Sequence, residues 1–223
     1  MKKLILFGLG LLLLTSTGYA QNTKEQRKER EAITKMSDKE LKAKVSRDVK
    51  KQAKACKKQG WQVNVGALSL EKQIEKAQRM QYEYNDDNSP KYFMGEMTAK
   101  AQSYAAAKAQ ALAFAKEDLA GMIATEVTAL VENTRANEQI SATDAASIAK
   151  TVQAGKQLIA QRLSNVIPVV EVYRMDGKLY EVQTRIFYDR NIALQAAKQV
   201  VRQELEKDGQ KLHKELDEIW GVK

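Results

Sequence analysis

The sequence predicts an α+β protein in which long helices pack on one face of a small antiparallel sheet, with an N-terminal basic helical arm. Three observations predict this class. Long segments carry apolar residues at helical spacing, one Asp-Gly pair separates two alternating segments within residues 166–188, and the 223 residues include two prolines and eleven glycines. So few turn-forming residues favour long elements joined by short connections.

Residues 1–20 have the pattern of a secretory signal peptide. Two lysines precede the apolar run Leu4–Leu14, and small residues lead up to Ala20. An apolar run of this length is shorter than the ~20 residues that a membrane-spanning helix needs. We therefore expect cleavage before Gln21, no transmembrane span after cleavage, and export. No cysteine lies beside the cleavage position, so lipid attachment there has no acceptor.

The net charge of +9 is concentrated in one segment. Residues 24–58 contain fourteen basic and six acidic side chains, whereas residues 59–223 carry a net charge of −1. The basic balance therefore belongs to an arm, residues 21–60, and the remaining body is close to neutral.

The arm is expected to form a helix with two different sides. Ser37 and Glu40 match a capping box, which predicts a helix from there to Lys58 that stops at Gly60. One side is apolar and holds Leu41, Val45, Val49, Ala53 and Cys56. The opposite side is a basic stripe of Lys44, Arg47, Lys51, Lys54 and Lys58. We expect the apolar side to pack on the body with the stripe outward, which suits an anionic surface or an acidic partner; insertion into a membrane interface is the alternative.

The body begins with a strand and helix unit, residues 61–91. Trp61, Val63 and Val65 alternate with polar residues and predict a strand. Ser69 opens a helix, whose expected inward residues are Leu70, Ile74, Ala77 and Tyr84. A turn is expected at 85–90 and a second strand at 92–98, where Gly95 indicates a bulge or a close backbone approach.

Residues 92–198 are expected to hold the sheet and a pair of helices. An alanine-rich helix over 99–135 would be about 50 Å long. Its expected inward stripe is Ala105, Ala109, Leu112, Leu119, Ile123, Val127 and Leu130. A second helix starts at Thr143, with Ile148, Val152, Ile159 and Leu163 inward.

The pair Asp176-Gly177 predicts a hairpin with a two-residue type I′ turn. That register pairs Tyr173 with Tyr180, Glu171 with Val182, Val169 with Thr184 and Ile167 with Ile186. The face that carries these residues is expected to bury against the long helices. Asp189 then caps a last helix, which continues through the C-terminal segment 199–223 and bends or frays at Gly209.

The run from Tyr92 to Ala120, with its closely spaced alanines, and the later segment that ends in Tyr188-Asp189 resemble the Lpp-twenty family of bacterial envelope lipoproteins. The similarity covers roughly residues 61–198. It implies a sheet packed on a long helix, similar to dodecin-like βαββ folds and to the N-terminal domains of flagellar envelope-ring proteins. It also implies a place in the periplasm or at the outer membrane. The chain departs from the lipoprotein members because it lacks the acylated cysteine.

Catalytic chemistry finds little support in the sequence. With one cysteine and one histidine, a zinc site of Cys and His ligands and a disulfide framework lack residues, and a Ser/His triad could use only His213. His213 is expected on a helix surface, and Asp86 and Asp87 in a turn that lacks the pattern of a calcium loop. Cys56 is expected as a buried thiol, with an intermolecular disulfide as the alternative. No catalytic residue, metal ligand or cofactor is predicted.

These observations favour a non-enzymatic protein, exported to the periplasm or outer-membrane periphery of a Gram-negative-type cell. There it would act as a binding or assembly module that contacts other envelope proteins or an anionic envelope surface. Nucleic acid is not an expected partner, because export separates the chain from it. Homo-oligomerisation is left open. The alternative function is a surface-exposed ligand-binding protein or adhesin.

Overall fold

The computed structural model describes residues 28, 35, 39, 43–164, 166, 168–210 and 212–221. The chain divides into two compact units, Met1–Lys44 and Val45–Lys223, and the fold below is that of the second. The predicted signal segment, residues 1–20, lies outside the described residues, as do Ser37 and Leu41 of the predicted arm helix.

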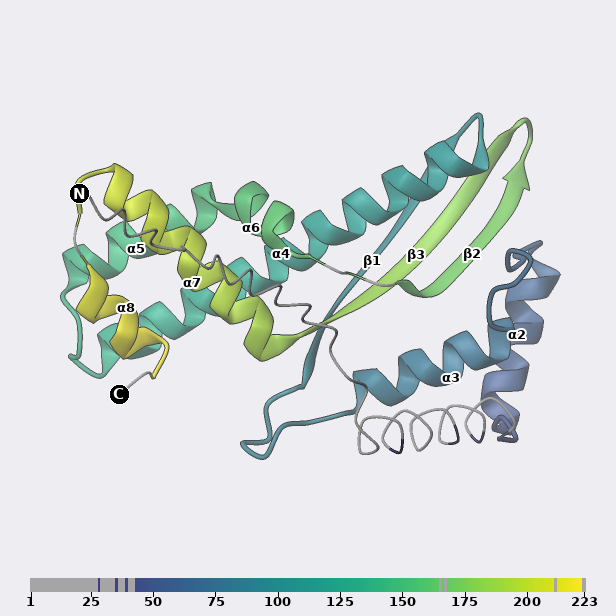
Figure 1. The fold of residues 1–223 in the computed structure, drawn as a ribbon, viewed down its shortest axis with the longest axis horizontal. Coiled ribbons are helices and arrows are strands. Elements are labelled where there is room, and N and C mark those ends of the chain that lie inside the picture. The colour runs from purple at the N-terminus through teal and green to yellow at the C-terminus, as the bar shows by residue number, and fades with distance from the viewer. Residues whose placement is uncertain are drawn as a thin grey trace, which may run out of the picture. The chain divides into compact units, whose positions relative to one another are not determined.

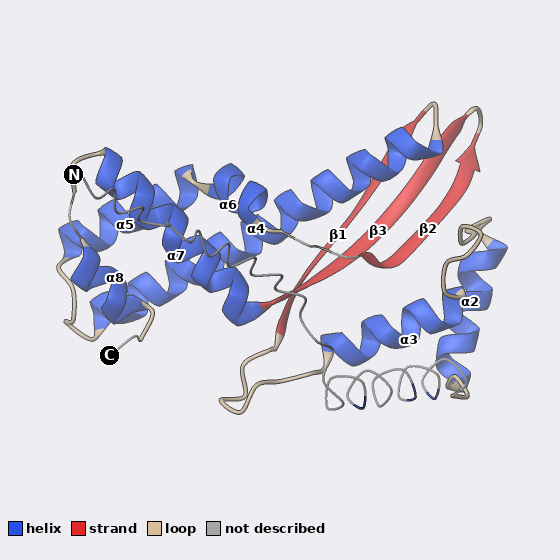
Figure 2. Ribbon diagram, in the orientation of Figure 1, coloured by secondary structure: helices blue, strands red, loops and turns tan. Residues whose placement is uncertain are grey.

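The second unit combines helices with one antiparallel sheet, which confirms the α+β class (Figures 1 and 2). In chain order the elements are α2 (Arg47–Lys58), α3 (Leu70–Gln81), β1 (Tyr92–Ala101), α4 (Tyr104–Ala136), α5 (Ala142–Ala154), α6 (Lys156–Arg162), β2 (Pro168–Asp176), β3 (Leu179–Asp189), α7 (Arg190–Lys207) and α8 (His213–Ile219).

The sheet has the strand order β1-β3-β2, and helices cover both of its faces (Figure 1). The first half of α4 packs on one face, where Ala107 and Ala111 contact Val182. The helices α2 and α3 cover the other face, where Ala53 and Leu70 share a cluster with Phe187. The sequence predicted the long helix on one face; the second helical layer is an addition to that prediction.

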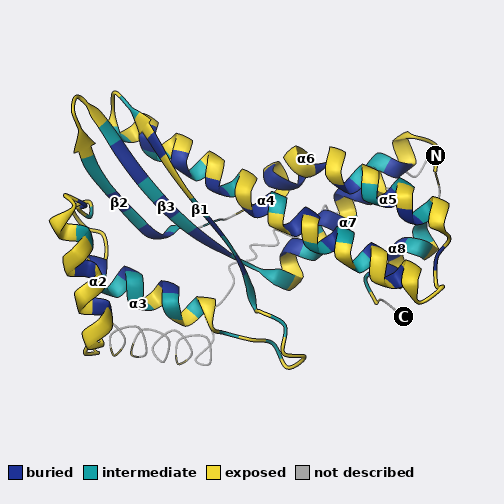
Figure 3. Cartoon of the chain, turned by 180° about the vertical axis from the view of Figure 1, so that it is seen from behind, coloured by how far each residue is buried: buried dark blue, intermediate teal, exposed yellow. Residues whose placement is uncertain are grey.

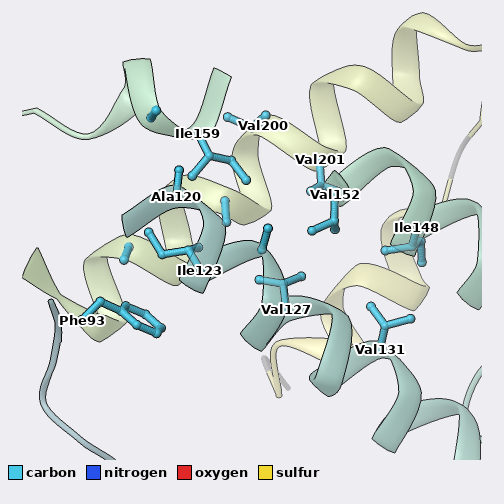
Figure 4. Close-up of a cluster of buried hydrophobic side chains, with 14 of the residues drawn as sticks. Phe93, Ala120, Ile123, Val127, Val131, Ile148, Val152, Ile159, Val200 and Val201 are labelled. Atoms are coloured by element: carbon cyan, nitrogen blue, oxygen red, sulfur yellow. The ribbon is translucent and has the colours of Figure 1, made fainter. Parts of the chain in front are cut away.

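The largest core lies beyond the sheet, where the second half of α4 packs against α5, α6, α7 and α8 (Figure 4). The residues predicted to point inward from the second helix, Ile148, Val152, Ile159 and Leu163, are all buried. That helix is divided at Gly155 into α5 and α6. The last helix begins as predicted, because the Asp189 carboxylate accepts a hydrogen bond from the Ile192 N–H at 3.0 Å. It is interrupted around Gly209, so that α7 and α8 are separate.

The predicted register of the hairpin is wrong by two residues. Asp176 pairs with Leu179, which leaves Gly177 and Lys178 as the loop, and Tyr173 therefore lies opposite Val182. Gly177 has φ +61° and Lys178 is not in the left-handed region, which is the arrangement of a type II′ turn with glycine first. A shift of two residues keeps every side chain on its face. The predicted face does bury against α4, with Val182 and Ile186 fully buried.

An irregularity between Pro168 and Val170 changes the end of β2. Val169 was predicted on the face toward α4, opposite Thr184, but it lies in the cluster under α2 and α3, and Glu171 takes its place in the pairing. The extra residue of a bulge turns one position to the other face. The predicted partner of Ile186, Ile167, lies outside the described residues.

The long helix starts later than predicted and faces the sheet at a different angle. Ala99 to Ala101 continue β1, and the Ser103 hydroxyl caps the helix by accepting from the Ala106 N–H. Strand pairing here overrides the helix preference of alanine. In the first half of the helix Ala105 and Ala109 are exposed, whereas the buried positions are Ala107, Ala111 and Ala115. In the second half Leu119, Ile123 and Val127 are buried as predicted.

Three predictions near the N-terminal end are also corrected. The arm helix does not continue through residues 43–46; it begins at Arg47, because the Ser46 hydroxyl caps it by accepting from the Val49 N–H. The strand predicted at 61–65 is reduced to a bridge between Gln62 and Tyr173, and Val65 is 99% exposed. Helix α3 ends at Gln81, so Tyr84 is not part of its buried side and is largely exposed.

Gly95 permits a close contact between the sheet and α4. A Cβ atom placed on Gly95 would lie 2.2 Å from the backbone oxygen of Ala115 and 3.2 Å from the Leu119 side chain. No side chain fits there, because neither the helix backbone nor the strand can move without disturbing its hydrogen bonds. The prediction of a close backbone approach at Gly95 is confirmed.

We predict that Gly95→Ala lowers the free energy of unfolding by at least about 2 kcal/mol, since the added methyl group overpacks the interface. Urea unfolding followed by circular dichroism measures this change. The control is Gly121→Ala in α4, the helix that Gly95 contacts, where an added Cβ meets no atom within 4 Å. That variant should gain roughly 0.5–1 kcal/mol from helix propensity. Equal stability of the two variants would contradict the role assigned to Gly95.

Candidate functional site

Helix α2 buries residues on one side and exposes the rest (Figure 3). Val49 and Ala53 are buried and Cys56 is half-buried, all on the side that packs on the body. At about 100° per residue, the basic side chains of the helix fall within an arc of about 120° on the opposite side. We call this exposed surface the α2 basic face; it consists of Arg47, Lys50, Lys51, Lys54, Lys57 and Lys58. Packing of the apolar side therefore aims six cations at solvent.

The structure thus brings together Arg47, Lys51, Lys54 and Lys58 of the predicted basic stripe and adds Lys50 and Lys57 to them. Lys44 is exposed as well, but it belongs to the preceding unit, Met1–Lys44, and is not part of the face as defined.

Few of these cations are neutralised by neighbouring carboxylates. Lys57 donates to Glu71 of α3 at 2.6 Å, and Lys51 lies 3.8 Å from Asp48, with both side chains more than 80% exposed. Within the described part of the chain, Arg47, Lys50, Lys54 and Lys58 have no ion pair. An exposed pair such as Lys51 with Asp48 contributes little. The α2 basic face therefore keeps most of its positive charge.

Helix α3, which packs against α2, is held to the sheet by the side chain of Gln73. The sequence pattern did not indicate this contact. Gln73 of α3 is 4% exposed; its amide oxygen accepts from the Glu171 N–H at 2.8 Å, and its amide nitrogen donates to the Leu68 carbonyl. The bridge between Gln62 and Tyr173 covers the same edge of β2. An unpaired strand edge invites association with other chains. Gln73 both closes this edge and fixes the position of α3.

Cys56 is half-buried on the side of α2 that faces a groove. The groove lies between α2, α3 and the sheet, and the polar residues that line it from β1 and β3 are Glu96, Gln183 and Arg185. Sequence reasoning missed these three residues. Charged and amide side chains that alternate with apolar ones in a strand have the same pattern as an ordinary solvated sheet face.

A second polar cluster lies on the face toward α4. The Tyr104 hydroxyl donates to the Glu171 carboxylate at 2.5 Å, and the Lys108 ammonium lies 2.9 Å from the same oxygen. Burial, followed by the hydrogen bond to Glu171, raises the pKa of Tyr104 to about 12. The phenol stays protonated at neutral pH and acts as a donor that holds the start of α4 to β2. Its role is therefore structural.

Asp87, His213 and Trp220 each make local contacts within the fold. Asp87 accepts from the Ser89 N–H at 2.9 Å within the predicted turn. His213 starts α8 and lies 3.4 Å from Glu206. Trp220 donates its indole N–H to the Leu194 carbonyl. Over the described residues, no group of three or more His, Cys, Asp or Glu side chains is placed to hold a metal ion.

In the part of the chain that the structure describes, no helix has the length and apolar character needed to cross a membrane. Comparisons with protein family models, with curated proteins and with solved structures find no match to this chain. The resemblance to the Lpp-twenty family stays a prediction, and the candidate functional surfaces are the α2 basic face and the groove beside it.

The pair Lys57–Glu71 joins α2 to α3, and its effect on stability should depend on pH. The hydrogen bond from Lys57 lowers the pKa of Glu71. Because the folded-state value lies below the unfolded value of about 4.3, the pair stabilises the protein fully above that pH. The contribution disappears as the pH falls through the lowered folded-state pKa.

We predict that Lys57→Gln lowers the free energy of unfolding by about 0.5 kcal/mol at pH 7, a small value because the Lys57 side chain is 55% exposed. The loss should be smaller at pH 3. Urea titrations at both pH values measure it, and Lys51→Gln serves as the control, since its partner lies at 3.8 Å in solvent. A loss that is the same at both pH values would contradict the assignment to Glu71.

Proposed function

We propose that this protein is a non-enzymatic binding module of the bacterial cell envelope, which attaches to an anionic envelope surface through the α2 basic face. The observation that carries the proposal is the exposure of six cations on one side of a helix whose other side is packed on the body, four of them without an ion pair among the described residues. The six cations repel one another, and an anionic surface would reduce this repulsion.

The proposed location follows from the sequence. The pattern of residues 1–20 and the resemblance to the Lpp-twenty family both favour export to the periplasm or the outer-membrane periphery. Members of that family carry an acylated cysteine, which this chain lacks beside the predicted cleavage position. Attachment by charge would take the place of attachment by a lipid chain and would be reversible.

The composition of α2 favours binding on the surface of a membrane over insertion into it. Helices that insert carry Trp, Phe or Leu on the side that enters the lipid. The sequence of α2, RDVKKQAKACKK, has none of these residues, and its apolar side chains Val49 and Ala53 are already buried in the protein. The contact would therefore be electrostatic, with each cation contributing about 1 kcal/mol and a strong dependence on salt.

The test is sedimentation of the full chain with vesicles of phosphatidylglycerol and phosphatidylethanolamine. We predict that the variant R47Q/K51Q/K54Q/K58Q binds these vesicles about 100- to 1,000-fold more weakly than the wild type, because four contacts of about 1 kcal/mol are lost. Wild-type binding should weaken steeply with added salt and be absent on phosphatidylcholine vesicles.

The matched control removes the same charge elsewhere. In K150Q/K156Q/K178Q/K214Q, four exposed lysines outside α2 are replaced, so the net charge equals that of the first variant. This control should keep vesicle binding close to that of the wild type. If both variants lose binding equally, net charge and not the α2 basic face is responsible, and the proposed contact is wrong.

A further inference from the structure

We propose that the groove between α2, α3 and the sheet binds a single-chain anionic amphiphile, with the apolar chain inside the groove and the head group at the edge formed by α2. The groove is a different surface from the α2 basic face, although Lys51 and Lys58 belong to the face and also lie near the edge of the groove. The proposal stands whether or not the protein attaches to vesicles.

The groove has the size and lining of a small-molecule site. Its volume is about 530 Å³, within the range of about 300–1,000 Å³ typical of such sites. Its apolar lining is formed by Ala55, Trp61, Leu70, Ile74, Val170 and Val172. Its polar lining is formed by Glu96, Gln183 and Arg185 of β1 and β3, together with Gln52, Gln59 and Arg174. Apolar walls beside a few fixed polar groups suit an amphiphile better than a fully polar ligand.

The charged groups that line the groove, Glu96, Arg174 and Arg185, already have partners. Arg185 holds the Glu96 carboxylate at 2.7 Å, and the Gln183 amide donates to the same carboxylate at 2.8 Å. Arg174 donates to Glu181 at 2.6 Å, and its guanidinium lies 4.5 Å from the centre of the Trp61 ring. A charged ligand group placed inside would have to break these pairs. The part of the ligand that enters the groove is therefore apolar.

Cations available to an anion lie at the edge of the groove instead. Ala55 lines the groove, and on the helix surface it neighbours Lys51 four residues before it and Lys58 three residues after it. Lys58 has no ion pair among the described residues, and Lys51 has only its exposed contact with Asp48. An anionic head group at this edge would meet two cations while its chain stays in contact with Trp61 and Ile74.

The groove exists because α2 carries small side chains where it approaches the sheet. Ala55 and Cys56 line it from α2, while Gln73 anchors α3 at the edge of β2. The helical layer therefore rests on β2, and the small residues of α2 leave the space over β3 and β1 unfilled. Larger side chains on the groove side of α2 or α3 would close this space without touching the buried core around α4.

The experiment is a calorimetric titration with decanoate below its micelle concentration, with decyl phosphate, decanol and inorganic phosphate as further probes. Ala55→Phe and Ile74→Phe each fill the groove and should weaken decanoate binding at least about tenfold. The control Ala146→Phe places the same side chain at an exposed position of α5 and should bind as the wild type does. Circular dichroism confirms that each variant is folded.

The head group of the amphiphile is tested separately from its alkyl chain. K51Q/K58Q should weaken decanoate binding about tenfold, since two contacts of about 1 kcal/mol are lost or reduced, and should leave decanol binding unchanged. Tighter binding of decanoate assigns a carboxylate head, tighter binding of decyl phosphate assigns a phosphate head, and both results support the proposal. Full competition by inorganic phosphate alone would overturn it, because the head would then carry the binding.

The proposal is also overturned if the wild type binds neither decanoate nor decyl phosphate, or if folded Ala55→Phe and Ile74→Phe both bind them as the wild type does. Its failure is distinguishable from failure of vesicle attachment. Ala55→Phe keeps all six cations of the α2 basic face and should still sediment with anionic vesicles. A variant that loses decanoate binding but keeps vesicle binding is altered in the groove. A variant that loses vesicle binding but keeps decanoate binding is altered in the α2 basic face.

Discussion

The fold depends on the contact between Gly95 of β1 and the backbone of α4 at Ala115, where no Cβ atom fits. Because the strand and the helix touch without a side chain between them, α4 lies flat along the sheet through its buried alanines. The same helix then continues past the end of the sheet, where its second half carries the core shared with α5, α6, α7 and α8. One close approach thus joins the sheet to the helical core and leaves the opposite face of the sheet for α2 and α3.

The second helical layer is built on an edge strand that must be protected. β2 exposes the backbone N–H of Glu171, which Gln73 satisfies from α3, and the backbone of Tyr173, which pairs with Gln62. At the other edge, the Asp118 carboxylate accepts from the N–H of Glu96. These contacts discourage pairing with other chains. They also hold α3, and through α3 the basic helix α2, on a rigid support.

Local patterns predicted the elements well and the contacts between them less well. The II′ turn and the even shift of register show why: an Asp-Gly pair locates a hairpin, but turn type and register also depend on how β1 and α4 pack on the strands. The inward side of α4 could not be read from its first half, because alanine occupies both the exposed positions 105 and 109 and the buried positions 107 and 111. Where leucine, isoleucine and valine mark one side, from Leu119 onward, the prediction holds.

The two candidate surfaces also differ in how far the sequence could predict them. The α2 basic face follows from residues within one helix, and helical periodicity alone places its cations together. The groove is made by side chains far apart in the sequence, from Ala55 to Arg185, which only the packing of α2 and α3 on the sheet brings together. Both surfaces involve α2: its small residues Ala55 and Cys56 line the groove, and its exposed cations include Lys51 and Lys58 near the edge of the groove. A substitution on the inner side therefore alters the groove while the charge on the outer side stays, which makes α2 a helix whose two contacts can be separated by mutation.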